Sequence, residues 1–225
     1  NLAYRAAMGF LERTGRSASV EIELTKRLPS AAGLGGGSSD AGAVLRGLTE
    51  IWPGDLSEGD LADLALSLGA DVPFFLDPRP ALVAGIGEQI RSISGFPSLY
   101  LLLANPGRAL STADVFRAWD QQDPSLTPAT AGSTLPALSR FLESGLEQVA
   151  QGPTALDELL VNDLEKAALS LCPELGGLMA DLAARGARSV SMSGSGATIF
   201  GVFDSLEQAE SAQKMLALGD SGWSR

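Results

Sequence analysis

The chain has 225 residues, 45% of them hydrophobic and 19% charged, which is typical of a globular protein and excludes a disordered one. Its formal net charge of -11 argues against a nucleic acid bound on a broad basic face, whereas a small anion held by local donors remains compatible with it. No apolar run is long enough to span a membrane and no basic-then-apolar leader opens the chain, so we expect a cytoplasmic protein without a membrane partner.

Two absences restrict the chemistry further. Histidine does not occur, and cysteine occurs once, as Cys172. Nucleophile pairs of the Ser-His and Cys-His type are therefore excluded within this sequence, as are an internal disulfide and the usual zinc sites. A general base has to be a carboxylate, a lysine or a tyrosine.

The first part of the chain predicts helices around one strand and one loop. Apolar residues at near-helical spacing predict a helix over 2–12, with no cap evident before Asn1. SVEIEL (19–24) alternates in polarity and predicts a half-buried strand. The loop PSAAGLGGGSSD (29–40) follows, and a helix over 38–52 leaves it.

A third helix carries clear boundary signals. Ser57 and Asp60 form a capping box that opens a helix over 58–68, and Gly69 would end it.

Four strand segments are predicted after residue 80, together with several helices. The segments 80–93 and 98–107 predict strands, the second so apolar that we expect it in the centre of a sheet. Two further strands over 187–194 and 197–203 are joined by a glycine turn. Helices are predicted over 112–120, 134–149, 155–171, 174–185 and 205–216, with a loop over 121–133. Helices and strands are thus interleaved in two blocks, divided near residue 83.

The glycine-rich loop has two interpretations. A flexible linker has this composition, but it would face solvent without fixed neighbours. A strand that enters the loop and a helix that leaves it favour an anion cradle, in which backbone N–H groups and the helix dipole hold a phosphate. The residues that would form the cradle are Gly33, Gly35, Gly36 and Gly37, with hydroxyl donors from Ser38 and Ser39.

Two familiar phosphate loops do not match. A Walker loop requires a lysine that is missing here, and the dinucleotide fingerprint requires a glycine where Ser38 stands. The sequence instead resembles the P-x-x-x-G-L-G-x-x-S-S signature of the GHMP kinase superfamily. The residues in register are Pro29, Gly33, Leu34, Gly35, Ser38 and Ser39.

The resemblance is closer within that superfamily. LGADVPFFL, GIGE, NPG followed by STADVF, ND at 162–163 and SMSGSGATIF stand in the order seen in 4-diphosphocytidyl-2-C-methyl-D-erythritol kinases. This resemblance implies an α+β, two-domain GHMP kinase fold. A ribosomal protein S5-like ATP-binding domain would cover 1–83, and a ferredoxin-like substrate domain would cover 84–225. The resemblance also implies ATP with Mg²⁺ as phosphoryl donor, no metal ligand from the chain, and a hydroxyl of the cytidine diphosphate-linked tetritol of the non-mevalonate isoprenoid pathway as acceptor.

Asp71, in LGADVPFFL, also has two interpretations. It could cap the turn that Pro73 opens. Alternatively, apolar neighbours and the negative end of the preceding helix would raise its pKa and make it a better base. The resemblance implies that Asp71 is the catalytic base that accepts the proton of the substrate hydroxyl.

The segment SGSGA (193–197) is, from sequence alone, typical of a hairpin turn. The resemblance implies that this turn packs near the phosphate loop and binds the ligand through Gly194, Ser195 and Gly196.

Four residues are assigned by resemblance only. It places Asn1 and Lys26 at the adenine pocket, and Thr112 and Phe116 at the substrate, with the Phe116 ring on cytosine. From spacing alone, helix packing is an equal alternative for Phe116.

The chain departs from the resembled family at its start. Members begin with a strand that carries a Lys-x-Asn pair and then a Tyr-His pair, and neither occurs here. We therefore expect a fragment that lacks the N-terminal strands and the closing strand and has weak activity by itself, or a non-catalytic nucleotide-binding homologue. A kinase of the homoserine or mevalonate type and a non-enzymatic scaffold also stay open at the level of sequence.

Overall fold

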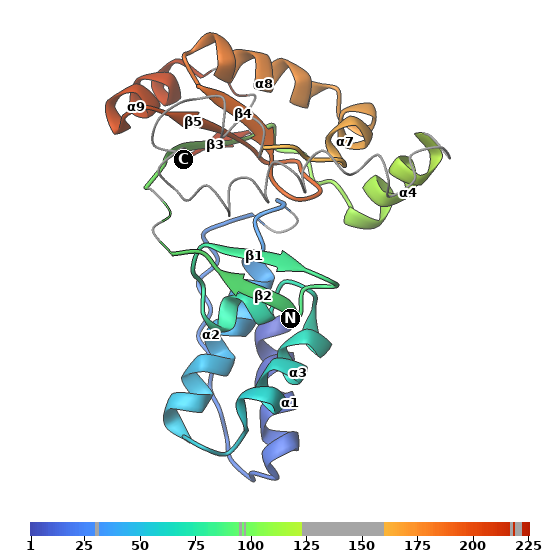
Figure 1. Ribbon diagram of the computed structural model, residues 1–225, viewed down its shortest axis with the longest axis vertical. Coiled ribbons are helices and arrows are strands. Elements are labelled where there is room, and N and C mark those ends of the chain that lie inside the picture. Colours follow the sequence, from blue (N-terminus) through green and yellow to red (C-terminus); the bar gives the residue numbers. More distant parts are fainter. Residues whose placement is uncertain (30–31, 95, 97, 123–159, 217, 219–221) are drawn as a thin grey trace. The chain divides into compact units, whose positions relative to one another are not determined.

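The computed structural model describes residues 1–29, 32–94, 96, 98–122, 160–216, 218 and 222–225 (Figure 1). The chain divides into two compact units. Unit 1 comprises Asn1–Ser30 and Gly35–Phe96, and unit 2 comprises Ala31–Leu34 and Pro97–Arg225. The glycine-rich loop therefore contributes residues to both units.

Unit 1 is built on helices. These are α1 (Leu2–Thr14), α2 (Gly36–Ile51), α3 (Glu58–Leu68) and the 3₁₀ helix η1 (Pro73–Leu76), so all three predicted helices are confirmed. Their facing sides pack into one apolar core that includes Ala6, Phe10, Ala41, Leu45, Leu48, Leu64, Ala65 and Val72. The stripes at helical spacing in the sequence are the residues that meet there.

Two helix starts are fixed by side chains. The N–H of Asp60 donates to Ser57 Oγ over 3.1 Å, which confirms the predicted capping box at α3. At the start of α1, Asn1 Oδ1 accepts from the N–H of Ala3 at 2.9 Å, a role that the sequence analysis did not assign to Asn1. Asn1 is itself the capping residue.

The strand predicted over 19–24 is wrong. These residues form neither helix nor strand, and Ile22 and Leu24 remain 36% and 37% exposed. Alternating polarity defines two faces, but a strand also needs a partner for its N–H and C=O groups. Among the residues that the structure describes, no strand pairs with this segment.

A hairpin completes unit 1. The predicted strand region 80–93 folds into β1 (Ala81–Ala84) and β2 (Gln89–Ser92), paired antiparallel. The GIGE motif supplies the turn between them. A boundary at residue 83 would cut β1, and the whole hairpin stays with unit 1.

Unit 2 contains a four-stranded sheet of order β4-β5-β3-β6. The strands are β3 (Tyr100–Asn105), β4 (Ser189–Met192), β5 (Ile199–Phe203) and β6 (Trp223–Ser224). Each pair is antiparallel. β3 lies between two neighbours, which confirms the central position predicted from its apolar sequence.

Within the described residues, four helices contribute to the core of unit 2. They are α4 (Thr112–Gln122), α7 (Glu165–Leu171), α8 (Glu174–Ala184) and α9 (Leu206–Met215). α8 packs on β4 and β5, and α9 packs on β3 and β5 (Figure 1). The predicted helix over 155–171 begins only at Glu165 in the described part, and predictions for 123–159 lie outside the described residues.

The sequence predicts no membrane-spanning helix. Within the described ranges, no single helix is long and apolar enough to cross a membrane. Only α7 and α8 together reach that length and composition, and the pair is bent by 119°.

Candidate active site

The start of α2 offers unsatisfied hydrogen-bond donors. Gly35 precedes the helix in a left-handed conformation (φ 62°) and gives it no side-chain cap. The first N–H groups of this 16-residue helix therefore point out of its positive end without a capping side chain. Such an end binds a phosphate without any further charged group.

The glycines of the loop serve two different purposes. A Cβ atom on Gly33 (φ +73°) would lie 2.4 Å from Ser193 O, and one on Gly35 would lie 3.2 Å from the Phe75 ring. A Cβ atom on Gly36, in contrast, would meet no atom within 4 Å. The first two glycines allow close packing, whereas Gly36 leaves open space at the helix start. A linker would lack such fixed neighbours, so the linker interpretation is wrong for the described part of the loop.

The turn 193–196 lies against the loop, within unit 2. Ser193 Oγ donates to Gly33 O over 2.7 Å, and a Cβ atom on Gly194 would lie 3.3 Å from the same oxygen. The segment also connects β4 to β5 as a turn, closed by a 2.9 Å hydrogen bond from Ser193 N to Thr198 O. The structure thus brings the second glycine motif to the first, as the resemblance implied.

Two further predicted residues meet at this turn. The hydroxyls of Thr112 and Ser195 lie 2.8 Å apart. Phe116, one helical turn after Thr112, is 49% exposed, whereas its neighbour Val115 is buried. Helix packing therefore does not bury the ring of Phe116, and its contact with the substrate stays a prediction.

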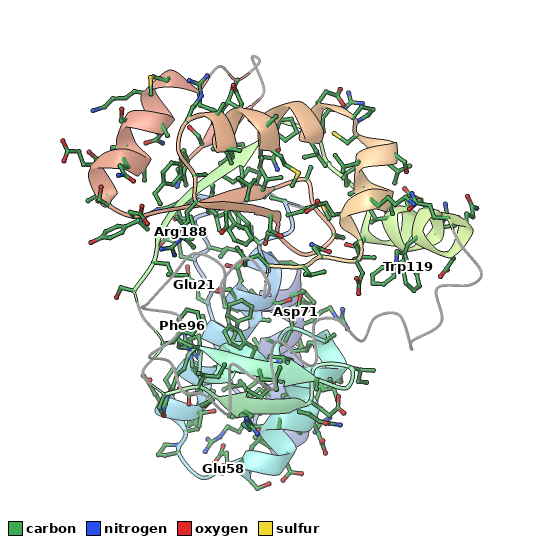
Figure 2. The ribbon with its side chains drawn as sticks, turned by 45° about the horizontal axis from the view of Figure 1, so that its top comes forward. Glu21, Glu58, Asp71, Phe96, Trp119 and Arg188 are labelled. Atoms are coloured by element: carbon green, nitrogen blue, oxygen red, sulfur yellow. The ribbon has the colours of Figure 1, made fainter. Side chains whose placement is uncertain are left out.

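Asp71 follows α3 in a tight turn and is labelled in Figure 2. The N–H of Val72 donates to Gly69 O over 3.1 Å, and Val72 and Pro73 take the buried side of this turn. Asp71 itself is exposed, so the apolar surroundings predicted for it are wrong. The capping alternative also fails, because η1 has no side-chain cap.

Packing fixes this turn on α2. A Cβ atom on Gly42 would lie 2.5 Å from Phe75 Cβ, so the backbone of α2 meets η1 without room for a side chain. The Phe75 ring also contacts Gly35 at the N-cap of α2. Asp71 therefore lies two residues before a 3₁₀ helix that packs on α2, the helix whose first N–H groups are uncapped.

The GIGE turn packs against Ala70, the residue before Asp71. A Cβ atom on Gly87 (φ +113°) would lie 1.9 Å from Ala70 O, so only glycine fits there. Glu88 accepts the N–H of Ile86 at 2.7 Å, and hydrogen bonds from its own N–H and from Ile86 hold the pKa of Glu88 below its ordinary value. No role for this turn was predicted, since its contact with Ala70 joins distant parts of the chain.

The remaining predicted residues lie around the loop in other ways. Lys26 forms an ion pair with Asp40 of α2, and Asn1 is occupied as the cap of α1. Ser38 and Ser39 are half-buried in the first turn of α2, Leu34 is half-buried, and Pro29 and Gly37 are exposed. The adenine-binding role of Asn1 and Lys26 stays a prediction.

Comparison with known proteins gives the class of this fold and site. Residues 1–77 match the GHMP kinases N terminal domain, and residues 143–219 match the GHMP kinases C terminal domain. The structure resembles a homoserine kinase from Cytophaga hutchinsonii with a TM-score of 0.77, at 21% identity over 95% of this chain and 70% of that one. The α+β fold of a GHMP kinase is thereby confirmed.

Relatives of one kind are more similar in sequence. The 4-diphosphocytidyl-2-C-methyl-D-erythritol kinase of Agrobacterium fabrum is 41% identical over 216 residues, which are 95% of this chain and 67% of the relative. That of Syntrophotalea carbinolica is 39% identical over 99% of this chain and 74% of the relative. A crystal structure of 4-(cytidine 5'-diphospho)-2C-methyl-D-erythritol kinase matches with a TM-score of 0.74, 37% identity, and coverage of 100% of this chain and 76% of that one. The chain belongs to the 4-diphosphocytidyl-2-C-methyl-D-erythritol kinase family.

Proposed function

We propose that this protein transfers the γ-phosphoryl group of ATP to a hydroxyl of 4-diphosphocytidyl-2-C-methyl-D-erythritol, in the cytoplasm, as a step toward isoprenoid precursors. The observation that carries the proposal is the uncapped start of α2 behind a glycine loop, in a chain about 40% identical to kinases of that name. Phosphoryl transfer depends mainly on positioning and on charge stabilisation, and a helix N-terminus supplies both.

The nucleotide phosphates would be held by the chain's own N–H groups at the start of α2. Mg²⁺ would accompany ATP, because it neutralises phosphate oxygens and usually keeps several water ligands. Among the described residues no group of three acidic, histidine or cysteine side chains could hold a metal alone.

Asp71 would act as the general base. Its carboxylate takes the proton of the acceptor hydroxyl while that oxygen bonds to phosphorus and the bridging oxygen leaves with ADP. An exposed side chain on a turn fixed against α2 supports this role, since it can reach a substrate without moving the backbone.

The acceptor would be bound by residues of unit 2. The exposed ring of Phe116 supports stacking on cytosine, and the paired hydroxyls of Thr112 and Ser195 support a polar contact. Gly194 and Gly196 would keep the turn close to the ligand, because both adopt positive φ and carry no side chain.

The test is ADP formation with three alcohols offered separately: the cytidine diphosphate-linked tetritol, homoserine and mevalonate. We expect kcat/KM for the first to exceed the others by on the order of 10³ or more, because binding sites built for polar groups discriminate strongly. Faster turnover of homoserine or mevalonate would contradict the proposed substrate. ATP binding without ADP formation would instead support the non-catalytic alternative.

A further inference from the structure

The side chain of Asn162 links three backbone groups. It precedes α7 and is half-buried. Its Nδ2 donates to Met192 O and to Gly194 O, each over 2.8 Å, and its Oδ1 accepts from the N–H of Leu164 at 3.0 Å. Both amide hydrogens are thus used on one turn. Since carbonyl oxygens only accept, the amide nitrogen is the atom that faces them.

The turn that Asn162 holds is rich in glycine. Gly194 and Gly196 have φ of 58° and 86°, a region that glycine enters at no steric cost. A glycine turn is adaptable by itself, because glycine loses more conformational freedom on ordering than any other residue. Two hydrogen bonds from one rigid amide fix the end of β4 and the middle of the turn together.

The same turn determines where Gly33 lies. Ser193 Oγ donates to Gly33 O, and the α-carbon of Gly33 is so close to Ser193 O and Gly196 O that a Cβ atom would lie 2.4 and 2.7 Å from them. A displaced turn must therefore displace Gly33. Gly33 is two residues before Gly35, the N-cap of α2, so it belongs to the same glycine-rich loop.

We infer that Asn162 is a positioning residue for nucleotide binding: its amide fixes the turn 193–196, and the turn fixes the phosphate loop at Gly33. This inference rests on the proposed function, in which that loop holds the phosphates. Asn162 touches no reacting atom and acts through backbone carbonyls only.

The decisive variant is Asn162→Asp. It keeps the shape and the acceptor for Leu164, but it turns an oxygen toward the two carbonyl oxygens that the amide nitrogen now contacts. At about pH 8 we expect the dissociation constant of ADP to rise about tenfold or more, since both carbonyl oxygens lose their donor and face a carboxylate instead. The KM for ATP should rise with it, and kcat should change less.

The pH dependence separates positioning from a general loss of structure. When the introduced carboxyl becomes protonated, its hydroxyl can donate one of the two lost hydrogen bonds. The ratio of the variant's ADP dissociation constant to that of the parent should therefore fall as the pH is lowered from about 8 to about 5. Asn162→Ala, which removes the donors and adds no charge, should bind ADP weakly at both pH values.

Gln213→Glu is the matched control. Gln213 Nε2 also donates to a backbone carbonyl, Ser224 O, over 3.0 Å in the same unit, but between α9 and β6. We expect the unfolding midpoint to fall for both carboxylate variants and ADP binding to weaken only for Asn162→Asp.

Two results would overturn the inference. One is Asn162→Ala with the ADP affinity of the parent, and the other is an equal loss of ADP affinity in Gln213→Glu. A parent protein that binds no ADP would count against the proposed function itself. If the parent binds ADP and the Asn162 variants bind it equally well, the result would count against the role of Asn162 and not against the proposed function.

Discussion

The two units are built on different kinds of secondary structure. In unit 2, β3 lies between β5 and β6, and each strand finds its partners within the described residues. In unit 1, helices α1, α2 and α3 form the core, and the only sheet among the described residues is the hairpin of β1 and β2, in which β2 is exposed throughout. Unit 1 contains the uncapped start of α2 and Asp71, and unit 2 contains the turn 193–196, which sets the position of Gly33.

The largest effect is expected at Asp71, in unit 1. Asp71→Asn keeps the size of the side chain but cannot accept the proton, so kcat should fall by on the order of 10²–10⁴. The ADP dissociation constant should stay unchanged, because the N–H donors of α2 are untouched. Steady-state kinetics and ADP titration measure the two quantities.

Asp77→Asn is the control for that variant. Asp77 is exposed just beyond η1 and pairs with Arg79 on the surface, so its loss should leave kcat near that of the parent. A near-normal kcat for Asp71→Asn would rule out Asp71 as the general base.

Separate cores should unfold separately. Leu45→Ala in unit 1 and Leu182→Ala in unit 2 each empty a fully buried site and should cost roughly 2–5 kcal/mol. The single thiol, Cys172, reports on unit 2, where burial and then the neighbouring Glu174 raise its pKa. Leu182→Ala should accelerate labelling of Cys172 by a thiol reagent, and Leu45→Ala should not. Equal acceleration by both would mean that the two cores form one cooperative unit.

Gly33→Ala tests the contact between the loop and the turn. The methyl group would meet Ser193 O at 2.4 Å, and positive φ alone costs a non-glycine residue on the order of 1–3 kcal/mol. We expect ADP affinity to fall by about tenfold to a hundredfold. Gly47→Ala in α2 is the control, since its Cβ meets no atom within 4 Å and alanine favours helix. Equal affinities in the two variants would show that the loop does not hold the nucleotide.

The smallest effect concerns an ion pair in unit 1. The hydrogen bond from Arg16 holds the pKa of Asp55 below its ordinary value, and Arg16 also lies 4.8 Å above the Trp52 ring. A lowered pKa stabilises the fold above the pKa of the unfolded chain, and this stabilisation is lost as the pH falls through the folded-state pKa.

Asp55→Asn should therefore be less stable than the parent near neutral pH. The difference should disappear in acid, and urea denaturation of both proteins across this range measures it. A difference that persists in acid would assign the effect to packing instead of charge.

Local signals in the sequence predicted the fold well where local interactions decide it. The Ser57–Asp60 capping box, the glycines before α2 and the apolar run of β3 each act over a few residues. The strand prediction for 19–24 was wrong because alternating polarity does not provide the partner strand that a β-strand needs. The capping role of Asn1 was missed because Asn1 lies before the apolar residues whose spacing predicted the helix.

The candidate site was predictable in part for the same reason. The glycine loop is continuous in sequence, so its chemistry is visible there. The exposure of Asp71 depends on which residue of a tight turn enters the core, and Val72 does. The role of Asn162 depends on carbonyl groups of Met192 and Gly194, which only the folded chain brings to it.

The most direct test of the proposed function follows the phosphoryl group itself. The protein is incubated with ATP labelled in the γ-phosphate and with 4-diphosphocytidyl-2-C-methyl-D-erythritol, and the products are separated and identified by mass spectrometry. We expect one labelled phosphate on the tetritol for each ADP formed, and almost none with Asp71→Asn. Label released only as inorganic phosphate, or a substrate left unmodified while ADP forms, would contradict the proposed function.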